Sequence, residues 1–131
     1  MDWRLNNMCT ILLPIKPEYA NKIIQQTKLY EYRRRIGKRK IDKIVIYSTF
    51  PIKKVIAEVE VKGIVSSTPL KLWQDTKEYS GISKVKYMNY FGDKDVAFAY
   101  KLGKVTVYKN PKTLKDIGIN YCPQSYVYLE N

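Results

Sequence analysis

The spacing of hydrophobic residues along the chain predicts six β-strands. A short apolar run at residues 9–15 predicts one strand, and residues 42–49, with apolar side chains from Ile44 to Tyr47, predict a buried strand. A third strand, at residues 53–65, carries valine or alanine at every second position from Val55 to Val61, which indicates a half-buried strand. The remaining strands are predicted at residues 29–33, 96–108 and 124–130.

Two details of these strands predict how they are arranged. The strands at 42–49 and 53–65 are separated only by a turn near Phe50 and Pro51, so we expect them to pair. In the strand at 96–108, hydrophobic residues recur at period two until Gly103 interrupts them. A glycine inside such a pattern indicates a bulge or a tight bend.

The pattern changes to helical spacing in three places. Residues 17–27 place Tyr19, Ala20, Ile23 and Ile24 on one face, and Pro17 suits the first position of a helix. Two further helices are predicted to begin after Thr68 and Ser83, both good N-cap residues, and residues 113–118 form a single helical turn. Strands dominate and βαβ alternation is absent, so the predicted fold class is α+β, with a barrel-like sheet of about six strands and three or four short helices.

The length of 131 residues predicts a single domain, 1–131, with a core from about 9 to 130. The first residues lack the basic region and long apolar region of a secretion signal, and no segment approaches eighteen consecutive apolar residues. We therefore expect a soluble, cytoplasmic protein without a membrane partner.

Composition narrows the possible chemistry. The net charge of +12 favours polyanionic partners, which include RNA, DNA and anionic membrane surfaces. The chain contains no histidine, the usual general base near neutral pH and the commonest metal ligand. Cys9 and Cys122, at opposite ends of the sequence, fit no metal or redox motif and are interpreted as reduced thiols. No metal and no cofactor are predicted.

Lys28, Glu31 and Arg33 form a K-x-x-E-x-R motif where the first helix passes into a strand. Glu31 and Arg33 share one face of a strand, and Lys28 joins them only if the turn after the helix brings it round. Such a group can hold a phosphate or a base edge, or support acid–base chemistry. The alternative is a solvated row of ion pairs.

A basic loop follows immediately. Six of the eight residues in the segment 33–40 are cations and none is an acid: Arg33, Arg34, Arg35, Lys38, Arg39 and Lys40. Such a loop can follow a phosphate backbone, because each contact releases condensed counterions. The alternative is a solvated charge run. Five tyrosines near the loop or on the closing strand can stack on unpaired bases: Tyr30, Tyr32, Tyr121, Tyr126 and Tyr128.

The run IKPEYANKIIQQTKLYEYRRR resembles the opening signature of the ASCH family, G-x-K-x-x-E-x-R after a helix. Lys28, Glu31 and Arg33 stand at the three polar positions, and Gln26 stands where glycine is usual. Later segments, including IVIYSTFPIKKVIAEVEV and CPQSYVYL, resemble a bacterial and archaeal branch of this family described as predicted regulators. The resemblance extends from about Ile11 to Leu129.

This resemblance implies a fold similar to the PUA domain, with a cleft that faces the K-x-x-E-x-R motif and a general association with RNA or modified nucleotides. Lys16 and Ser48 match family positions at the rim of the cleft. Some relatives are amidohydrolases on N4-acylated cytidine, with a threonine nucleophile where this chain has Glu31, and a later glutamate that Glu78 matches best. Ribonuclease activity is attributed to other members.

Three functions therefore remain open. The leading hypothesis is a module that binds RNA or a nucleotide, with the basic loop on phosphates and the cleft on a base or ribose; DNA is also possible. The second is an enzyme, an amidohydrolase or a ribonuclease, in which Lys28, Glu31 and Glu78 are catalytic. The third is a protein-interaction module whose basic face binds an acidic partner.

Overall fold

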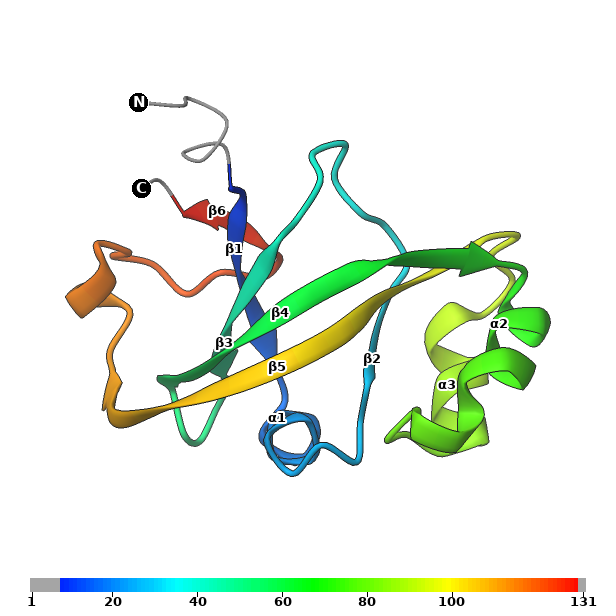
Figure 1. Ribbon diagram of the computed structural model, residues 1–131, viewed down its shortest axis with the longest axis horizontal. Helices are drawn as coiled ribbons and strands as arrows, with labels where there is room; N and C mark the ends of the chain where they lie inside the picture. Colours follow the sequence, from blue (N-terminus) through cyan, green and yellow to red (C-terminus); the bar gives the residue numbers. More distant parts are fainter. Residues whose placement is uncertain (1–7, 130–131) are drawn as a thin grey trace.

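The computed structural model describes residues 8–129, which form one six-stranded mixed sheet with helices packed against it (Figure 1). The strands are β1 (Thr10–Ile15), β2 (Tyr30–Arg33), β3 (Lys43–Ser48), β4 (Lys54–Ser67), β5 (Ala97–Lys112) and β6 (Val127–Leu129). The helices are α1 (Pro17–Ile24), α2 (Pro69–Thr76) and α3 (Lys84–Phe91), with the short 3-10 helices η2 (Lys77–Tyr79) and η3 (Lys115–Ile117). The predicted α+β class is confirmed. Residue 130, the predicted end of the core and of the last strand, lies outside the described residues.

The strands lie in the order β2-β5-β4-β3-β1-β6. Among the strands of residues 8–129 only β1 and β3 are a parallel pair, and the chain between them includes α1 and β2, a connection long enough for this pairing. The predicted pairing of β3 with β4 is confirmed, from Lys43 opposite Glu60 to Ser48 opposite Lys54. The register of β4 against β5 shifts close to Gly103, which confirms the predicted irregularity.

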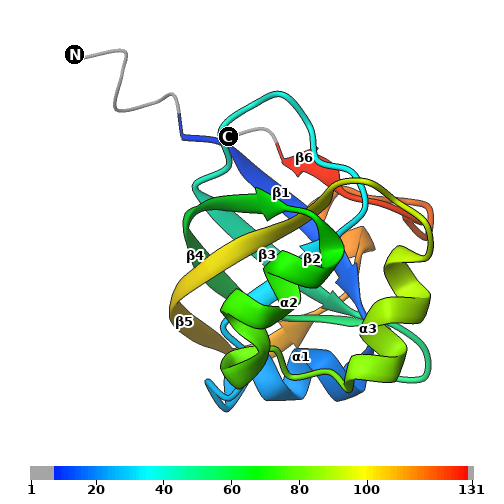
Figure 2. The ribbon, with the colours of Figure 1, turned by 90° about the vertical axis from the view of Figure 1, so that its right-hand side faces the viewer.

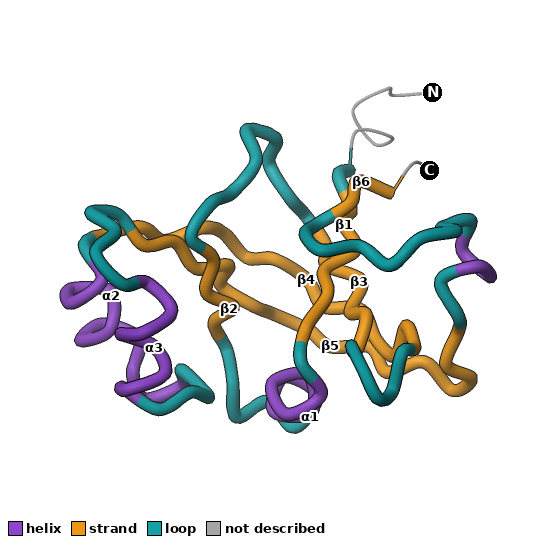
Figure 3. The backbone as a smooth tube through the Cα atoms, turned by 180° about the vertical axis from the view of Figure 1, so that it is seen from behind, coloured by secondary structure: helices purple, strands orange, loops and turns teal. Residues whose placement is uncertain are grey.

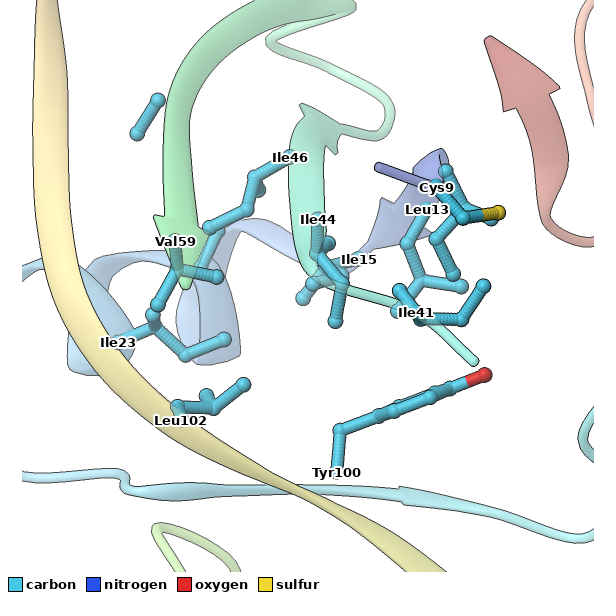
Figure 4. Close-up of a cluster of buried hydrophobic side chains, with 13 residues drawn as sticks. Cys9, Leu13, Ile15, Ile23, Ile41, Ile44, Ile46, Val59, Tyr100 and Leu102 are labelled. Atoms are coloured by element: carbon cyan, nitrogen blue, oxygen red, sulfur yellow. The ribbon is translucent and has the colours of Figure 1, made fainter. Parts of the chain in front are cut away.

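The sheet curls around its main core without closing. One hydrophobic cluster joins Tyr100 of β5 to Ile11 of β1, and Tyr128 of β6 packs against it. In a flat sheet β5 and β6 would lie about 19 Å apart. Figure 4 shows Tyr100 pointing toward Ile41 and the side chains of β1. Within the described residues the edge strands β2 and β6 do not pair, so the predicted barrel is approximate and has an open seam.

The helices cover two parts of the sheet. Ala20 and Ile23 of α1 pack into the main core, whereas α2 and α3 enclose a second cluster around Tyr87 and Phe91 at one end of β4 and β5 (Figure 2). Both predicted N-caps are confirmed. The Thr68 hydroxyl accepts the Lys71 backbone N–H at 3.2 Å, and the Ser83 hydroxyl accepts that of Lys86 at 3.2 Å. In residues 8–129, no helix has the length and hydrophobicity needed to cross a bilayer.

The end of α1 has an unusual backbone conformation. Gln25 closes the helix with φ of −74°, and Gln26 then adopts φ of +62°, in the left-handed region that favours glycine. This conformation reverses the chain, so that Lys28 can reach the face of β2 that carries Glu31. Gln26 occupies the position where the motif usually has glycine, and the structure shows the reason for that preference.

We expect Gln26→Gly to stabilise the protein by up to about 1 kcal/mol. It removes a left-handed strain of roughly 1–2 kcal/mol and adds roughly 0.5–1 kcal/mol of backbone entropy loss. The neighbouring Gln25→Gly is the matched control, because Gln25 has helical φ, and it should destabilise the protein by about 0.5–1 kcal/mol. Urea denaturation measures both changes. A Gln26→Gly variant as destabilised as the control would contradict the strain argument.

Candidate functional site

A cleft of about 550 Å³ lies at the seam of the sheet. Its walls come from the end of β1 and the start of α1, from β2, and from α3 with the segment before it. The lining residues are Pro14, Ile15, Lys16, Tyr19, Lys28, Glu31, Tyr32, Arg33, Ile82, Lys86, Asn89 and Tyr90. The cleft therefore forms at the open seam, between β2 and the end of β1 that lies beyond its pairing with β6.

Lys28 is buried, with only 2% of its surface exposed. Its ammonium group donates a hydrogen bond to the Ser80 carbonyl at 2.6 Å and lies 4.0 Å from Glu31 Oε1. It also faces the rings of Tyr32, at 4.8 Å from the centroid, and Tyr19, at 5.5 Å. These contacts replace part of the hydration that the ammonium loses on burial.

This arrangement of Lys28 depends on Gly81. Gly81 has φ of +66°, and a Cβ placed on it would lie 2.6 Å from the Cβ of Lys28. Only glycine meets both conditions without displacing the lysine. Lys22 of α1 donates to the Gly81 carbonyl at 3.2 Å, so two lysines hold the connection between α2 and α3 against α1.

Burial lowers the pKa of Lys28 from its ordinary value of 10.5 to about 8. Loss of hydration is the largest cause; the Glu31 carboxylate opposes it, and the nearby cations Lys22 and Arg33 add to it. A lysine with this pKa is partly neutral near physiological pH and is suited to proton transfer.

Glu31 and Arg33 complete the polar wall. Arg33 donates through one terminal nitrogen to Glu31 Oε2 at 2.7 Å and to the Pro14 carbonyl at 3.0 Å. The second bond crosses the seam from β2 to β1, where the described strands do not pair. Glu31 is thus paired with two cations, because Arg33 and Lys28 both contact it.

The opposite wall comes from α3, whose residues were not predicted to belong to the site. Ser83 caps this helix and Tyr87 and Phe91 are buried, so the same helical phase turns Lys86, Asn89 and Tyr90 toward the cleft. The N-cap and the two buried aromatics were visible in the sequence. What could not be read from it was that this helix lies across from β2.

The basic loop follows β2 (Figure 3) and contacts the α3 wall through Arg34. The Arg34 guanidinium stacks over the Tyr90 ring at 4.8 Å, and the Arg34 backbone N–H donates to the Tyr90 hydroxyl at 3.3 Å. Five loop cations are exposed and, in residues 8–129, form no ion pair with a carboxylate: Arg34, Arg35, Lys38, Arg39 and Lys40. The cleft thus adjoins a surface of uncompensated positive charge.

The sequence profile of the ASCH domain matches residues 13–108, which is most of the chain. This chain belongs to the ASCH family. The matched segment includes the K-x-x-E-x-R motif and every residue that lines the cleft.

A protein of Zymomonas mobilis named ASCH domain-containing ribonuclease is 31% identical over 122 residues, covering 90% of this chain and 82% of that protein. The crystal structure of ASCH from Zymomonas mobilis has a TM-score of 0.85 and 30% identity, covering 92% of this chain and 87% of that one. This ASCH domain also resembles segments of longer curated proteins, of which it spans well under two thirds. One is ATP synthase subunit alpha of Ureaplasma parvum serovar 3, at 28% identity over 122 residues, which cover 92% of this chain and 15% of the relative.

The structure brings most of the predicted site residues together. Lys28, Glu31 and Arg33 line the cleft, and Lys16 lies exposed at its rim. Ser48, predicted at the rim, is instead buried at 1% exposure and does not line the cleft. Its place in β3 turns the side chain inward, like those of Ile44 and Ile46.

Glu78 also lies apart from the cleft. It is exposed on η2 and is not among the lining residues, whereas the carboxylate beside Lys28 is Glu31. The amidohydrolase arrangement of Lys28, Glu31 and Glu78 is therefore not assembled. In residues 8–129, no group of three or more cysteines, aspartates or glutamates is placed to hold a metal ion.

We expect the Lys28 ammonium to titrate near pH 8, as followed by NMR of its side-chain signals. Glu31→Gln should lower this midpoint further, because it removes the charge that raises the pKa of Lys28. Between about pH 8 and 10.5 the unfolded chain retains a proton that the folded chain has lost, so Lys28 makes the free energy of unfolding increase with pH in that window.

Lys28→Met is the control for this pH dependence. The variant lacks the titrating group, so comparison with the unaltered protein isolates the contribution of Lys28 across the window. A midpoint at pH 10 or above, or an identical stability profile for Lys28→Met, would contradict the burial of a destabilised ammonium.

Proposed function

We propose that this ASCH domain binds single-stranded RNA, with one nucleotide in the cleft and the adjoining phosphates on the basic loop. The observation that carries the proposal is the continuity of the two features through Arg33. This residue lines the cleft beside Glu31 and also begins the run of cations. A ligand held by both must join a compact polar group to a polyanionic chain, and a nucleic acid has this composition.

The cleft has the size and chemistry for a nucleotide. Its volume of about 550 Å³ lies within the range of small-molecule sites. Lys28 supplies a donor, Glu31 an acceptor, and Tyr19 and Tyr32 supply ring faces near them. Unpaired bases are recognised by hydrogen bonds at their edges and by aromatic stacking, and this wall offers both.

RNA is favoured over DNA because the Zymomonas mobilis relative is named as a ribonuclease. Recognition of unpaired bases is also the usual mode by which proteins read RNA sequence. A cytoplasmic location, where RNA is abundant, belongs to the same proposal.

We expect affinity for a fluorescently labelled single-stranded RNA to fall steeply between about 50 and 200 mM salt. Replacing Arg34, Arg35, Arg39 and Lys40 by alanine should reduce the slope of log affinity against log salt by about 3, because each phosphate contact contributes roughly 0.7. Fluorescence anisotropy measures both quantities, and a DNA of the same sequence measures the preference for RNA.

The matched control replaces four exposed lysines remote from the loop in sequence: Lys77, Lys94, Lys104 and Lys109. Both variants have the same net charge, so only the position of the lost charge differs. If both reduce the slope equally, RNA responds to the total charge of the protein and the loop has no specific role. If no RNA binds at low salt, the proposal fails.

Cleavage of the bound RNA is a second candidate, favoured by the pKa of Lys28 near 8. In this reaction neutral Lys28 removes the proton of a ribose 2′-hydroxyl, and the 2′-oxygen forms a bond to phosphorus. The bond from phosphorus to the 5′-oxygen breaks, and that oxygen takes a proton from the Lys28 ammonium or from water. Roughly a tenth of the molecules have neutral Lys28 at pH 7, enough for general-base catalysis.

If the protein cleaves RNA, the rate should rise with pH and level off above about pH 8, as the neutral fraction of Lys28 increases. Lys28→Met should lower the rate about 100-fold or more. Gel analysis of a labelled RNA gives both results. Tyr79→Ala, an exposed substitution outside the cleft and prepared in parallel, should keep the full rate. Equal rates in both variants would identify a contaminating nuclease, and no cleavage at any pH would leave a binding module.

A further inference from the structure

A second hollow of about 590 Å³ lies at the far end of the basic loop. We call it the C-terminal groove, because one of its walls comes from residues 117–121 and β6; the other comes from the starts of β1 and β3 and from Glu58 of β4. The lining includes one ion pair and two tyrosines: Lys43, Glu58, Tyr121 and Tyr128.

The basic loop connects the two hollows. Arg33, its first cation, lines the cleft, and Lys43, just beyond its last, lines the C-terminal groove. Stacking fixes both ends of the loop, because Arg34 lies over Tyr90 of the cleft and Arg39 lies 4.4 Å from the ring centroid of Tyr128 in the groove. In Figure 3 the loop passes between the α2–α3 end of the sheet and the β1–β6 end.

Close packing holds the middle of the loop against β6, which forms one wall of the groove. A Cβ on Gly37 would lie 2.5 Å from the Tyr128 hydroxyl and 2.7 Å from the Tyr126 hydroxyl, so only glycine permits this approach. The acid that follows the loop in the sequence, Asp42, accepts the Cys9 backbone N–H at 2.9 Å. The exposed positive charge therefore continues from one hollow to the other.

The C-terminal groove resembles the cleft in its chemistry. Lys43 and Glu58 form an ion pair at 2.5 Å, which sets a donor beside an acceptor, as Lys28 and Glu31 do in the cleft. Tyr121 lines the groove and is 56% exposed. An exposed tyrosine in a half-apolar groove offers a face on which a base can stack.

We propose that the C-terminal groove is a second nucleotide subsite for the same RNA strand, with the intervening phosphates on the basic loop. This inference rests on the proposed RNA binding and extends it from one nucleotide to a strand. An RNA strand is the occupant that fits, because the path between the hollows is lined by cations and not by an apolar strip. An acidic peptide shares this charge but lacks bases for the two sets of rings.

Two RNA lengths test the second subsite. A labelled RNA of roughly 3 nucleotides reaches one hollow, whereas one of about 12 nucleotides can occupy both. We expect Tyr121→Ala to weaken binding of the longer RNA about fivefold or more and to leave binding of the shorter RNA unchanged. Tyr121→Phe should restore full affinity, because stacking requires the ring and not the hydroxyl.

Tyr79→Ala is the matched control, since Tyr79 is 48% exposed and lines neither hollow. Photo-crosslinking with the longer RNA containing 4-thiouridine, followed by mass spectrometry, should also label peptides that include Tyr121 or Tyr128. Together these results would support a continuous strand across the loop.

Three results would overturn the inference. If Tyr121→Ala binds the longer RNA as Tyr79→Ala does, and crosslinks stop at the loop, the second subsite is wrong but the proposed RNA binding stands. If polyglutamate binds in a Tyr121-dependent manner and RNA does not, the groove accepts acidic peptides instead. If neither RNA length binds, the proposed function fails together with its extension.

Discussion

The buried ammonium of Lys28 is the constraint on which the candidate site depends. A cation withdrawn from water needs compensating partners, and here they come from three separate segments. They are the Ser80 carbonyl before α3, the Glu31 carboxylate of β2 and the Tyr19 ring of α1. These contacts bind the end of α1, the start of β2 and the connection before α3 to one another. Gly81 is the necessary counterpart, because any side chain there would occupy the space of the lysine. One buried charge thus sets both the position of the cleft and the pKa of its central group.

The open seam of the sheet explains why a cleft exists at this position. A fully closed barrel would pair the edge strands β2 and β6 and leave its interior filled by side chains. In this ASCH domain the Arg33 side chain spans the gap to the Pro14 carbonyl, so a guanidinium takes the place of backbone pairing. A side chain can rearrange around a ligand more readily than a strand ladder. Arg33, which bridges the seam, is also the first cation of the basic loop, so the cleft and the loop are directly connected.

The basic loop is highly charged, yet contacts with aromatic rings hold it in place. Arginine planes stacked on Tyr90 and Tyr128 hold it at two points, and Gly37 allows it to approach the closing strand. Stacked arginines keep their outward N–H groups available for phosphates. A loop fixed in this way loses less conformational entropy on binding than a free one, which favours affinity at a given number of contacts. Because the loop connects the cleft to the C-terminal groove, its cations form a path between the two.

The sequence by itself determined the features that depend on neighbouring residues. Strand periodicity, the N-caps at Thr68 and Ser83, and the shared face of Glu31 and Arg33 follow from local geometry, and all are present in the structure. The tertiary structure alone decided which faces meet. It placed Lys86 and Asn89 of α3 across from β2, turned Ser48 into the core and left Glu78 outside the cleft. These outcomes depend on the curl of the sheet and on the left-handed turn at Gln26. The curl results from small twists in every strand and from contacts between residues far apart in the chain. The pattern of neighbouring residues therefore does not predict which surfaces meet in the folded protein.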